Sequence, residues 1–324
     1  MKNIFVTGVA GFIGNKVAEV LLQEGHSVVG IDDLNDYYDA RLKKWRLDRL
    51  GSFEGFHFVR GDIADYPLIK ETFNENSFDS VINLAARAGV RASVKDPWIY
   101  LDTNLKGTLN LLECCRESDV GQFILASTSS LYGFNEMPFS ETQNTDTPLA
   151  PYGATKKGAE ALSYSYHYLY GINVTIPRYF TVYGPAGRPD MSIFKFIRNI
   201  DTGKPIPVYG DGKQTRDFTY IDDIASGTVL AMGVKGYEII NLGNDNSVGL
   251  MYVINLIEDA LGMKADIKWL ERHPADVEAT WANIGKAKNI LKWSPGVKIE
   301  EGIERTVKWY KENRDFILSL REVE

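Results

Sequence analysis

The chain has 324 residues, of which 44% are hydrophobic and 24% are charged, the ordinary composition of a globular protein with an ample core. Its formal net charge of −7 argues against nucleic acid or an anionic membrane surface as a partner. The sequence has no apolar run of about 20 residues, no room for a signal peptide before the first apolar run, and only two, adjacent cysteines (Cys114 and Cys115), so it predicts a cytoplasmic protein with reduced thiols and no membrane span.

Short apolar runs alternate with helical patterns through the first half of the chain. The runs predict strands at Asn3–Thr7, Ser27–Ile31, Phe56–Arg60, Ser80–Leu84, Gln122–Ser127 and Asn173–Pro177. The helical patterns between them include Phe12–Gln23, Trp98–Arg116 and Tyr152–Tyr170. This alternation predicts right-handed βαβ crossovers and an α/β fold with a doubly wound parallel sheet. Such a sheet binds its ligands at the carboxyl ends of the strands.

The pattern changes after about residue 180. Proline and glycine become denser and the elements between them become shorter, before a final predicted helix at Ile299–Lys311. We therefore expect one domain over residues 1–180 and a smaller C-terminal α/β substrate-binding domain over residues 181–324, with their segments interleaved.

A glycine-rich turn joins the first predicted strand to the first predicted helix. Gly8 permits a tight turn, Gly11 lets the backbone approach a pyrophosphate, and Gly14 allows close packing of helix on strand. Free N–H groups at the start of the helix, which begins at Phe12 and Ile13, face the phosphate charge. Three glycines alone would mark only a turn, but their place between a strand and a helix favours dinucleotide binding.

An acidic residue at the end of the second predicted strand indicates which dinucleotide is bound. Asp32 lies 18 residues after Gly14, where a carboxylate accepts hydrogen bonds from the adenine ribose and repels a 2′-phosphate. NAD is therefore favoured over NADP, and residues 1–180 are predicted to form a Rossmann-type NAD-binding domain. Further cofactor contacts are predicted at Asp33, Asn35, Asp62, Ile63, Leu84, Ala85, Ala86, Asn104 and Tyr179.

Tyr152 and Lys156 lie four residues apart at the start of a predicted helix, and therefore on one face. A lysine ammonium beside a phenol stabilises the phenolate and lowers the pKa of the tyrosine from its usual value near 10, so that the tyrosine can act as a base on a sugar hydroxyl. A bare Y-x-x-x-K pair is common by chance and is also found as a surface tyrosine beside a solvated lysine. The hydroxyls of Ser127–Ser130, after the preceding strand, favour catalysis, with both residues also touching the cofactor.

These motifs together resemble the extended short-chain dehydrogenase/reductase family, over essentially the whole chain. The resemblance implies that the hydroxyl four residues before Tyr132, which is Thr128, hydrogen-bonds the reacting C4 oxygen of a nucleotide sugar. Family dehydratases carry Asp-Glu after this hydroxyl, and decarboxylases carry a Glu nearby. Ser129 and Ser130 stand here instead, which favours oxidation at C4 followed by re-reduction, and hence C4 epimerisation with tightly bound NAD.

Three stretches are similar to UDP-glucuronate 4-epimerases, at residues 33–38, 88–93 and 178–191. Neutral hexose 4-epimerases usually place Asn where Thr181 stands. Arg188 is expected to pair with a C6 carboxylate, with Thr181 and Ser129 donating further hydrogen bonds. The alternative for Arg188 is a loop arginine on a solvated edge.

The UDP end of the substrate is assigned from the same resemblance. Arg216 is expected to clamp the diphosphate, and Asp276 to lie near the ribose or a phosphate. Ala275 and Asn283 depart from the Gly and Asp that the family usually has there. The other predicted substrate contacts are Ser130, Arg91, Val208 and Tyr209. Arg87 is unusual after the fourth strand, and no role is assigned to it.

Two other functions stay open from the sequence. One is a UDP-glucose or UDP-N-acetylhexosamine 4-epimerase, and the other, of a different class, is a catalytically silent nucleotide-binding protein, against which intact Thr128, Tyr152 and Lys156 argue. No metal site is expected. The resemblance implies a homodimer through Trp98–Arg116 and Tyr152–Tyr170, although the apolar residues of these helices fit an intramolecular core equally well.

Overall fold

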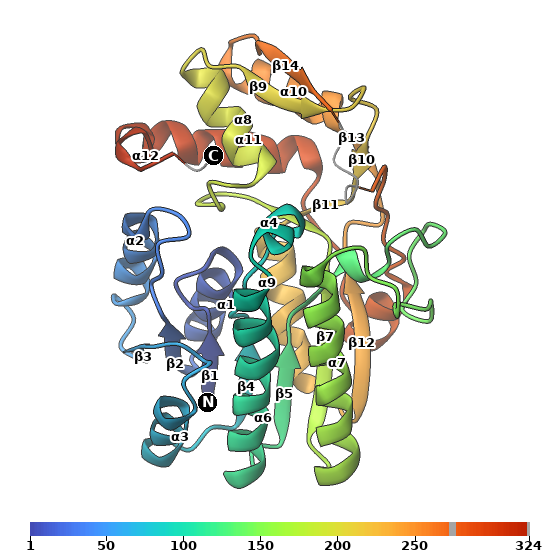
Figure 1. Cartoon of the computed structure of the whole chain (residues 1–324). Coiled ribbons are helices and arrows are strands. Elements are labelled where there is room, and N and C mark those ends of the chain that lie inside the picture. Colours follow the sequence, from blue (N-terminus) through green and yellow to red (C-terminus); the bar gives the residue numbers. More distant parts are fainter. Residues whose placement is uncertain (272–276, 323–324) are drawn as a thin grey trace.

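The computed structural model describes residues 1–271 and 277–322. Its centre is a parallel sheet with the strand order β12-β7-β5-β4-β1-β2-β3, with β6 paired to β7 (Figure 1). The strands are β1 (Asn3–Thr7), β2 (Ser27–Asp32), β3 (Phe56–Arg60), β4 (Ser80–Asn83), β5 (Gln122–Leu125), β6 (Ser127–Thr128), β7 (Asn173–Tyr179) and β12 (Tyr237–Leu242). The predicted doubly wound α/β fold is thereby confirmed.

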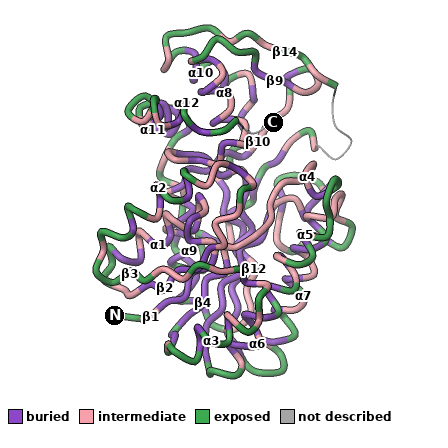
Figure 2. The backbone as a smooth tube through the Cα atoms, turned by 60° about the vertical axis from the view of Figure 1, so that its left-hand side comes forward, coloured by how far each residue is buried: buried purple, intermediate pink, exposed green. Residues whose placement is uncertain are grey.

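Alternate residues of β1 point to opposite faces of the sheet, and helices cover both faces. Phe5 belongs to one buried cluster, which includes residues of α3 (Tyr66–Glu75), α6 (Gly107–Glu117) and α7 (Pro151–Tyr170). Ile4 and Val6 belong to another, which includes residues of α1 (Phe12–Gln23) and α9 (Ile221–Leu230). The inner strands β1, β2, β4, β5 and β7 are buried over almost their whole length, as the purple segments of Figure 2 show, and this explains why they read as continuous apolar runs. The edge strand β3 contains no buried residue.

Two predicted elements are divided in the structure. The run Gln122–Ser127 is not one strand: β5 ends at Leu125, and Ala126 donates its N–H to Asn83 before β6 pairs with β7. The helix predicted at Trp98–Arg116 consists of α5 (Trp98–Tyr100), a π-helical turn at Leu101–Lys106, and α6. The buried side chain of Asn104 on this turn donates hydrogen bonds to Arg87 and Thr155 of neighbouring segments, and hydrophobic periodicity does not predict such contacts.

The second half of the chain contributes elements both to the central sheet region and to the upper part of the molecule. Its α9 packs on α1, and β12 extends the sheet beside β7, while the other elements form the upper part of Figure 1. These others are α8 (Ser192–Asp201), α10 (Leu250–Leu261), α11 (Ile299–Glu312) and α12 (Arg314–Ser319), with the strand pairs β8 (Thr181–Tyr183) and β11 (Phe218–Tyr220), β9 (Ile206–Tyr209) and β14 (Ile267–Leu270), and β10 (Thr215–Arg216) and β13 (Val248–Gly249). A second π-helical turn spans Ala287–Leu291, and short 3₁₀ turns lie at Ser129–Leu131 and Ala231–Gly233. The division at residue 180 stays a prediction.

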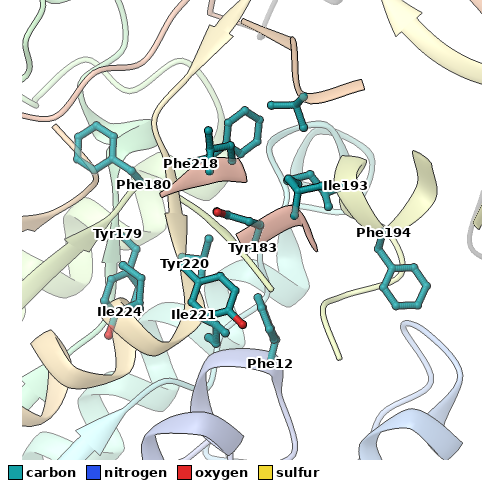
Figure 3. Close-up of a cluster of buried hydrophobic side chains, with 14 of the residues drawn as sticks. Phe12, Tyr179, Phe180, Tyr183, Ile193, Phe194, Phe218, Tyr220, Ile221 and Ile224 are labelled. Carbon is teal, nitrogen blue, oxygen red and sulfur yellow. The ribbon is translucent and has the colours of Figure 1, made fainter. Parts of the chain in front are cut away.

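Aromatic and aliphatic side chains fill the junction between the sheet and the upper part. Figure 3 shows Phe12 from α1 below Tyr183 and Phe218, with Ile193 and Phe194 beside them. All five side chains are buried. Because this cluster belongs to both parts of the molecule, it fixes the upper elements over the carboxyl ends of the strands.

Two short helices, α2 (Ala40–Leu50) and α4 (Val90–Lys95), lie near this junction. Among the described residues, no helix is both long and apolar enough to cross a bilayer.

Candidate active site

A cavity of about 430 Å³ lies at the carboxyl ends of the central strands. Most of the residues predicted to bind cofactor or substrate line it, although they come from segments far apart in the sequence. They are Gly8, Gly11, Phe12, Ile13, Gly14, Asp32, Asp33, Asn35, Asp62, Ile63, Leu84, Ala85, Ala86, Thr128, Ser129, Ser130, Tyr152, Lys156, Tyr179, Thr181 and Arg188.

The glycine turn has no room for side chains at its two ends. Gly8 has a φ of +67°, and a Cβ there would lie 2.8 Å from the backbone of Ala85. A Cβ at Gly14 would overlap the carbonyl oxygen of Gly8 and lie 2.8 Å from its carbonyl carbon. The turn is therefore a cradle lined by backbone at the start of α1, as a pyrophosphate requires.

Asp32 lies at the end of β2 with 8% of its surface exposed. It accepts hydrogen bonds from the N–H groups of Ala10 at 3.2 Å and Leu34 at 2.9 Å. Burial raises the pKa of Asp32, and the charge of Lys43 opposes this rise. The ammonium of Lys43, on α2, lies 3.4 Å from Asp32 and 3.7 Å from Asp33, so both carboxylates stay close to a buried cation.

Tyr152 and Lys156 lie on the first turns of α7 and face the cavity with Thr128. Thr128 donates to the hydroxyl of Ser130 at 3.2 Å and accepts from its N–H, also at 3.2 Å. Burial raises the pKa of Tyr152, against the effects of Thr128 and Arg188, which is opposite to the direction expected from a neighbouring ammonium. Burial also lowers the pKa of Lys156 to about 8. For both groups the loss of hydration on burial outweighs the opposing effects of their neighbours, which are Thr128 and Arg188 for Tyr152 and Glu160 for Lys156.

Arg188 lines the same cavity, and its side chain is 21% exposed, so it does not lie on a solvated edge. Its Nε and Nη2 donate to the two oxygens of Asp190 at 3.0 Å and 2.6 Å, and Nη2 also lies 3.3 Å from the Ala88 carbonyl. Thr181 lies in the wall of the same cavity. Arg188 and Thr181 therefore share one cavity wall, and a protein carboxylate, Asp190, is already paired with the arginine.

Several predicted site residues lie outside this wall. Arg91 stacks on Tyr209 with its guanidinium carbon 3.8 Å from the ring centre, and Val208 is fully buried beside it in β9. Arg216 donates to the carbonyls of Val277 at 3.0 Å and Glu278 at 3.1 Å. These contacts lie next to the stretch 272–276, and Asp276 falls outside the described residues.

Asn104 also lies outside the cavity wall, on the π-helical turn. Its side chain accepts from the N–H of Arg87 at 2.9 Å and donates to the Arg87 carbonyl at 3.0 Å and to Thr155 at 3.1 Å. It thereby holds the segment after β4 against α7. Arg87 lines the cavity and lies 3.8 Å from Asp33.

Comparison with known proteins identifies the family. Residues 5–306 match the family described as GDP-mannose 4,6 dehydratase, which is nearly the whole chain. The chain belongs to this family. It is an extended short-chain dehydrogenase/reductase, and the resemblance seen in the sequence motifs is confirmed.

Relatives and solved structures cover this short-chain dehydrogenase/reductase from end to end. It is 55% identical to a UDP-glucuronate 4-epimerase of Thermodesulfobacterium geofontis (strain OPF15), over 99% of its own length and 100% of the relative. The structure of a UDP-glucuronic acid 4-epimerase from Bacillus cereus, in complex with UDP-glucuronic acid and NAD, is 38% identical with a TM-score of 0.91, over 96% and 99% of the two chains. A UDP-glucose 4-epimerase from Thermotoga maritima is 31% identical with a TM-score of 0.90, over the same shares.

Next to Lys156 along α7, this short-chain dehydrogenase/reductase has a buried ion pair that sequence reasoning missed. Glu160, one turn after Lys156, binds Arg178 of β7 through two hydrogen bonds of 2.9 and 2.7 Å and accepts another from Ser127 at 2.6 Å. Glu160 raises the pKa of Lys156 against the larger effect of burial. The Y-x-x-x-K-x-x-x-E spacing, with one more helical turn, was the signal in the sequence.

Proposed function

We propose that this chain is a UDP-glucuronate 4-epimerase, which interconverts UDP-glucuronate and UDP-galacturonate through a 4-keto intermediate. The observation that carries the proposal is one cavity that contains both Tyr152, Lys156 and Thr128 and, beside them, Arg188 and Thr181. The first three residues suit oxidation at C4, and the last two suit a carboxylate. The names of the relatives from Thermodesulfobacterium geofontis and Bacillus cereus support the same activity.

NAD is the cofactor that the chain's residues fit. Gly8 and Gly14 line the cavity with backbone alone, as the approach of a diphosphate requires, and Asp32 lines it where the adenine ribose would lie. Bound NAD would take up hydride from C4 of the sugar and give it back. Because the cofactor is regenerated in each turnover, the protein needs no exchange of it during catalysis.

Tyr152 is the proposed base. Its hydroxyl oxygen would take the proton of the C4 hydroxyl, while the Thr128 hydroxyl hydrogen-bonds the same C4 oxygen and holds it in place. Lys156 in its ammonium form stabilises the phenolate. Among the lining residues, no acidic side chain stands next to Thr128, where a dehydratase would need one, so the sugar keeps its C6 group.

The carboxylate of the sugar needs control, because the 4-keto intermediate is a β-keto acid that loses CO2 when the carboxylate bond aligns with the carbonyl π system. Arg188 donates hydrogen bonds to Asp190 through Nε and Nη2, and within the described residues its Nη1 makes no hydrogen bond. Nη1, with the hydroxyls of Thr181 and Ser129, can hold the C6 carboxylate out of that alignment.

A 4-epimerase of a neutral UDP-hexose is the second candidate. One observation favours it: Asp190 already compensates the charge of Arg188, so a neutral sugar would leave no unpaired cation in the cavity. Solved structures at 31% identity include a UDP-glucose 4-epimerase and a UDP-N-acetylglucosamine 4-epimerase. Thr181 and the higher identity to a UDP-glucuronate 4-epimerase favour the acidic sugar.

We further propose a homodimer in the cytoplasm. Large apolar side chains lie exposed on two neighbouring helical segments at one face of the sheet. They are Trp98 on α5, Leu101 on the π-helical turn, Leu109 on α6, and Tyr164 and Tyr168 on α7. An exposed apolar surface of this kind on two adjacent helices suits a four-helix interface with a second copy. Cys114 and Cys115 are buried free thiols, which suits a reducing compartment.

The test is a product assay on purified protein with UDP-glucuronate, UDP-glucose and UDP-N-acetylglucosamine as separate substrates. We expect UDP-galacturonate from the first, with no release of CO2 and no added NAD needed. Tyr152→Phe serves as the control and should lose roughly a thousandfold in rate, since a positioned base contributes at that scale. Turnover of the neutral sugars with none of the acid would decide for the second candidate.

A further inference from the structure

Arg46, in the middle of α2, is a buried arginine that belongs to none of the predicted motifs. Only 1% of its surface is exposed. Within residues 1–271 and 277–322, no carboxylate forms an ion pair with its guanidinium. Burying a cation without an anion is costly, so its N–H groups need other partners.

Those partners are backbone carbonyls of two loops and the side-chain hydroxyl of Tyr38, eight residues before Arg46. Nη1 donates to the carbonyl of Ala10 at 3.0 Å and to the hydroxyl of Tyr38 at 2.7 Å. Nε and Nη2 both donate to the carbonyl of Ala186, at 3.2 and 2.6 Å, and Nη2 also donates to that of Gly187 at 3.1 Å. The guanidinium thus binds three backbone carbonyls, which is the planar fork geometry that arginine offers and lysine does not.

The two loops are the two halves of the active site. Ala10 lies inside the glycine turn, and its N–H is held by Asp32 while its carbonyl is held by Arg46. Ala186 and Gly187 directly precede Arg188 in the loop between β8 and α8. Ala186 has a φ of +53°, a left-handed conformation that is unfavourable for a residue other than glycine. Two hydrogen bonds from Arg46 to its carbonyl stabilise this conformation.

We propose that Arg46 is a positioning residue that fixes Arg188 relative to the cofactor turn and thereby contributes to the selection of an acidic sugar. The inference rests on the proposed function, in which Arg188 binds the C6 carboxylate. Tyr152, on α7, and the cofactor turn, between β1 and α1, lie in the lower part of the molecule, whereas Arg188 lies in the loop between β8 and α8. Arg46 is bonded to both, and a displacement of about 1 Å at such a site is enough to cost affinity and rate.

The test is a double-mutant cycle of Arg46→Met and Arg188→Met, read as KM and kcat for UDP-glucuronate and UDP-glucose. We expect Arg46→Met to raise KM for UDP-glucuronate about tenfold, with the amount of bound NAD and KM for UDP-glucose within about twofold of wild type. When Arg188→Met is already present, Arg46→Met should raise KM for UDP-glucuronate by less than about twofold further, because Arg46 acts through Arg188. Arg49→Met, an exposed arginine on the same helix, is the matched control and should change neither constant.

An equal rise in KM for both sugars, or an equal rise in both backgrounds, would assign Arg46 to general stability and overturn the inference. If Arg46→Met does not fold, Arg46→Lys takes its place in the cycle, since it keeps the charge but not the fork. Failure of the wild-type protein to epimerise UDP-glucuronate would overturn the proposed function alone. In that case the role of Arg46 is tested by calorimetric binding of the two UDP-sugars to the same variants. Losses of binding free energy that add in the double variant contradict the action of Arg46 through Arg188, and losses that do not add support that action.

Discussion

Burial controls the two titratable groups at the centre of the cavity. Tyr152 and Lys156 lie where their charged forms lose hydration, so burial raises the pKa of the phenol and lowers that of the ammonium to about 8. The buried Glu160, itself bound to Arg178, moderates the effect on Lys156. Tyr152 is therefore protonated at rest, and in the proposed reaction its proton transfer would depend on the bound substrate and on the charge of Lys156.

The pH dependence of turnover follows from this arrangement. Lys156 is an ammonium below its pKa of about 8 and neutral above it, so stabilisation of the phenolate is present at lower pH and is lost as pH rises through about 8. We expect kcat/KM for UDP-glucuronate to fall on the alkaline side of about pH 8. Lys156→Arg should shift this decline to higher pH, while Lys157→Arg, on the neighbouring residue, should leave it in place. A pH profile that stays flat to pH 10 in the wild-type protein would contradict the assignment.

Arg188 should decide between acidic and neutral sugars. Arg188→Met removes a charge-assisted hydrogen bond worth about 1.5–3 kcal/mol, and we expect KM for UDP-glucuronate to rise by about 10- to 100-fold. UDP-glucose should be affected little. A second readout is CO2, which should increase per turnover if Arg188 restrains the carboxylate. Equal kinetics of the variant and the wild-type protein on the acid would show that the carboxylate is bound elsewhere.

Single elements carry contacts that their own sequence pattern does not reveal. In α11 the apolar face packs on α10, and Ile303 and Val307 are buried as the helical pattern predicts. Gly302 on the same helix lies against Tyr183 of β8, a contact that leaves no room for a methyl group. A glycine that weakens an isolated helix therefore permits close packing between the helix and the strand.

Gly302→Ala tests this packing. In an exposed helix interior the change would stabilise by up to about 1 kcal/mol, but here a Cβ would overlap the Tyr183 hydroxyl and lie 2.7 Å from Cζ. We expect a loss of about 1–3 kcal/mol in the free energy of unfolding, measured by denaturant titration. Gly233→Ala, where no atom lies within 4 Å of the added carbon, is the control and should change little.

The Tyr183 hydroxyl allows a rescue experiment. It is buried, and within the described chain no hydrogen-bond partner contacts it. Tyr183→Phe should therefore be tolerated and should restore part of the stability lost in Gly302→Ala. A double variant as unstable as the sum of the two single changes would show that the overlap lies elsewhere.

On the scale of the whole molecule, the upper elements and the sheet share one core, and the cavity lies between them. The chain contributes α9 and β12 to the lower part after it has formed β8 and α8 in the upper part. The two parts are thus joined by several crossings and by the aromatic cluster of Figure 3. Exposed apolar side chains also lie on the segment from α5 to α6 and on α7, where we propose the dimer interface.

Dimer formation through that surface can be tested by introducing negative charges into it. Leu101→Glu together with Leu109→Glu, at positions 42% and 37% exposed, should convert a dimer to a monomer in sedimentation experiments, because it buries carboxylates at the interface. Leu230→Glu, an equally exposed leucine on α9, is the matched control and should leave the mass unchanged. A monomeric wild-type protein, or a dimer that survives the double change, would rule out this interface.

Features that depend on near neighbours along the chain could be predicted from the amino-acid sequence alone. Strands buried on both faces read as apolar runs, the glycine turn followed from the steric limits of a few residues, and Tyr152 and Lys156 followed from the period of one helix. Substrate residues such as Thr181 and Arg188 came from resemblance to a family, because their own segments carry no such local signal.

The contacts that these residues make could be seen only in the folded chain. Asp190 pairs with Arg188, Lys43 with Asp32, and Arg178 with Glu160, and burial reverses the expected direction of the Tyr152 pKa. Arg46 contacts a carbonyl 140 residues away in the sequence. Such contacts form where segments far apart in the sequence meet, between the sheet and the upper elements. No local period or spacing predicts them, because loss of hydration and long-range pairing are properties of the folded interior.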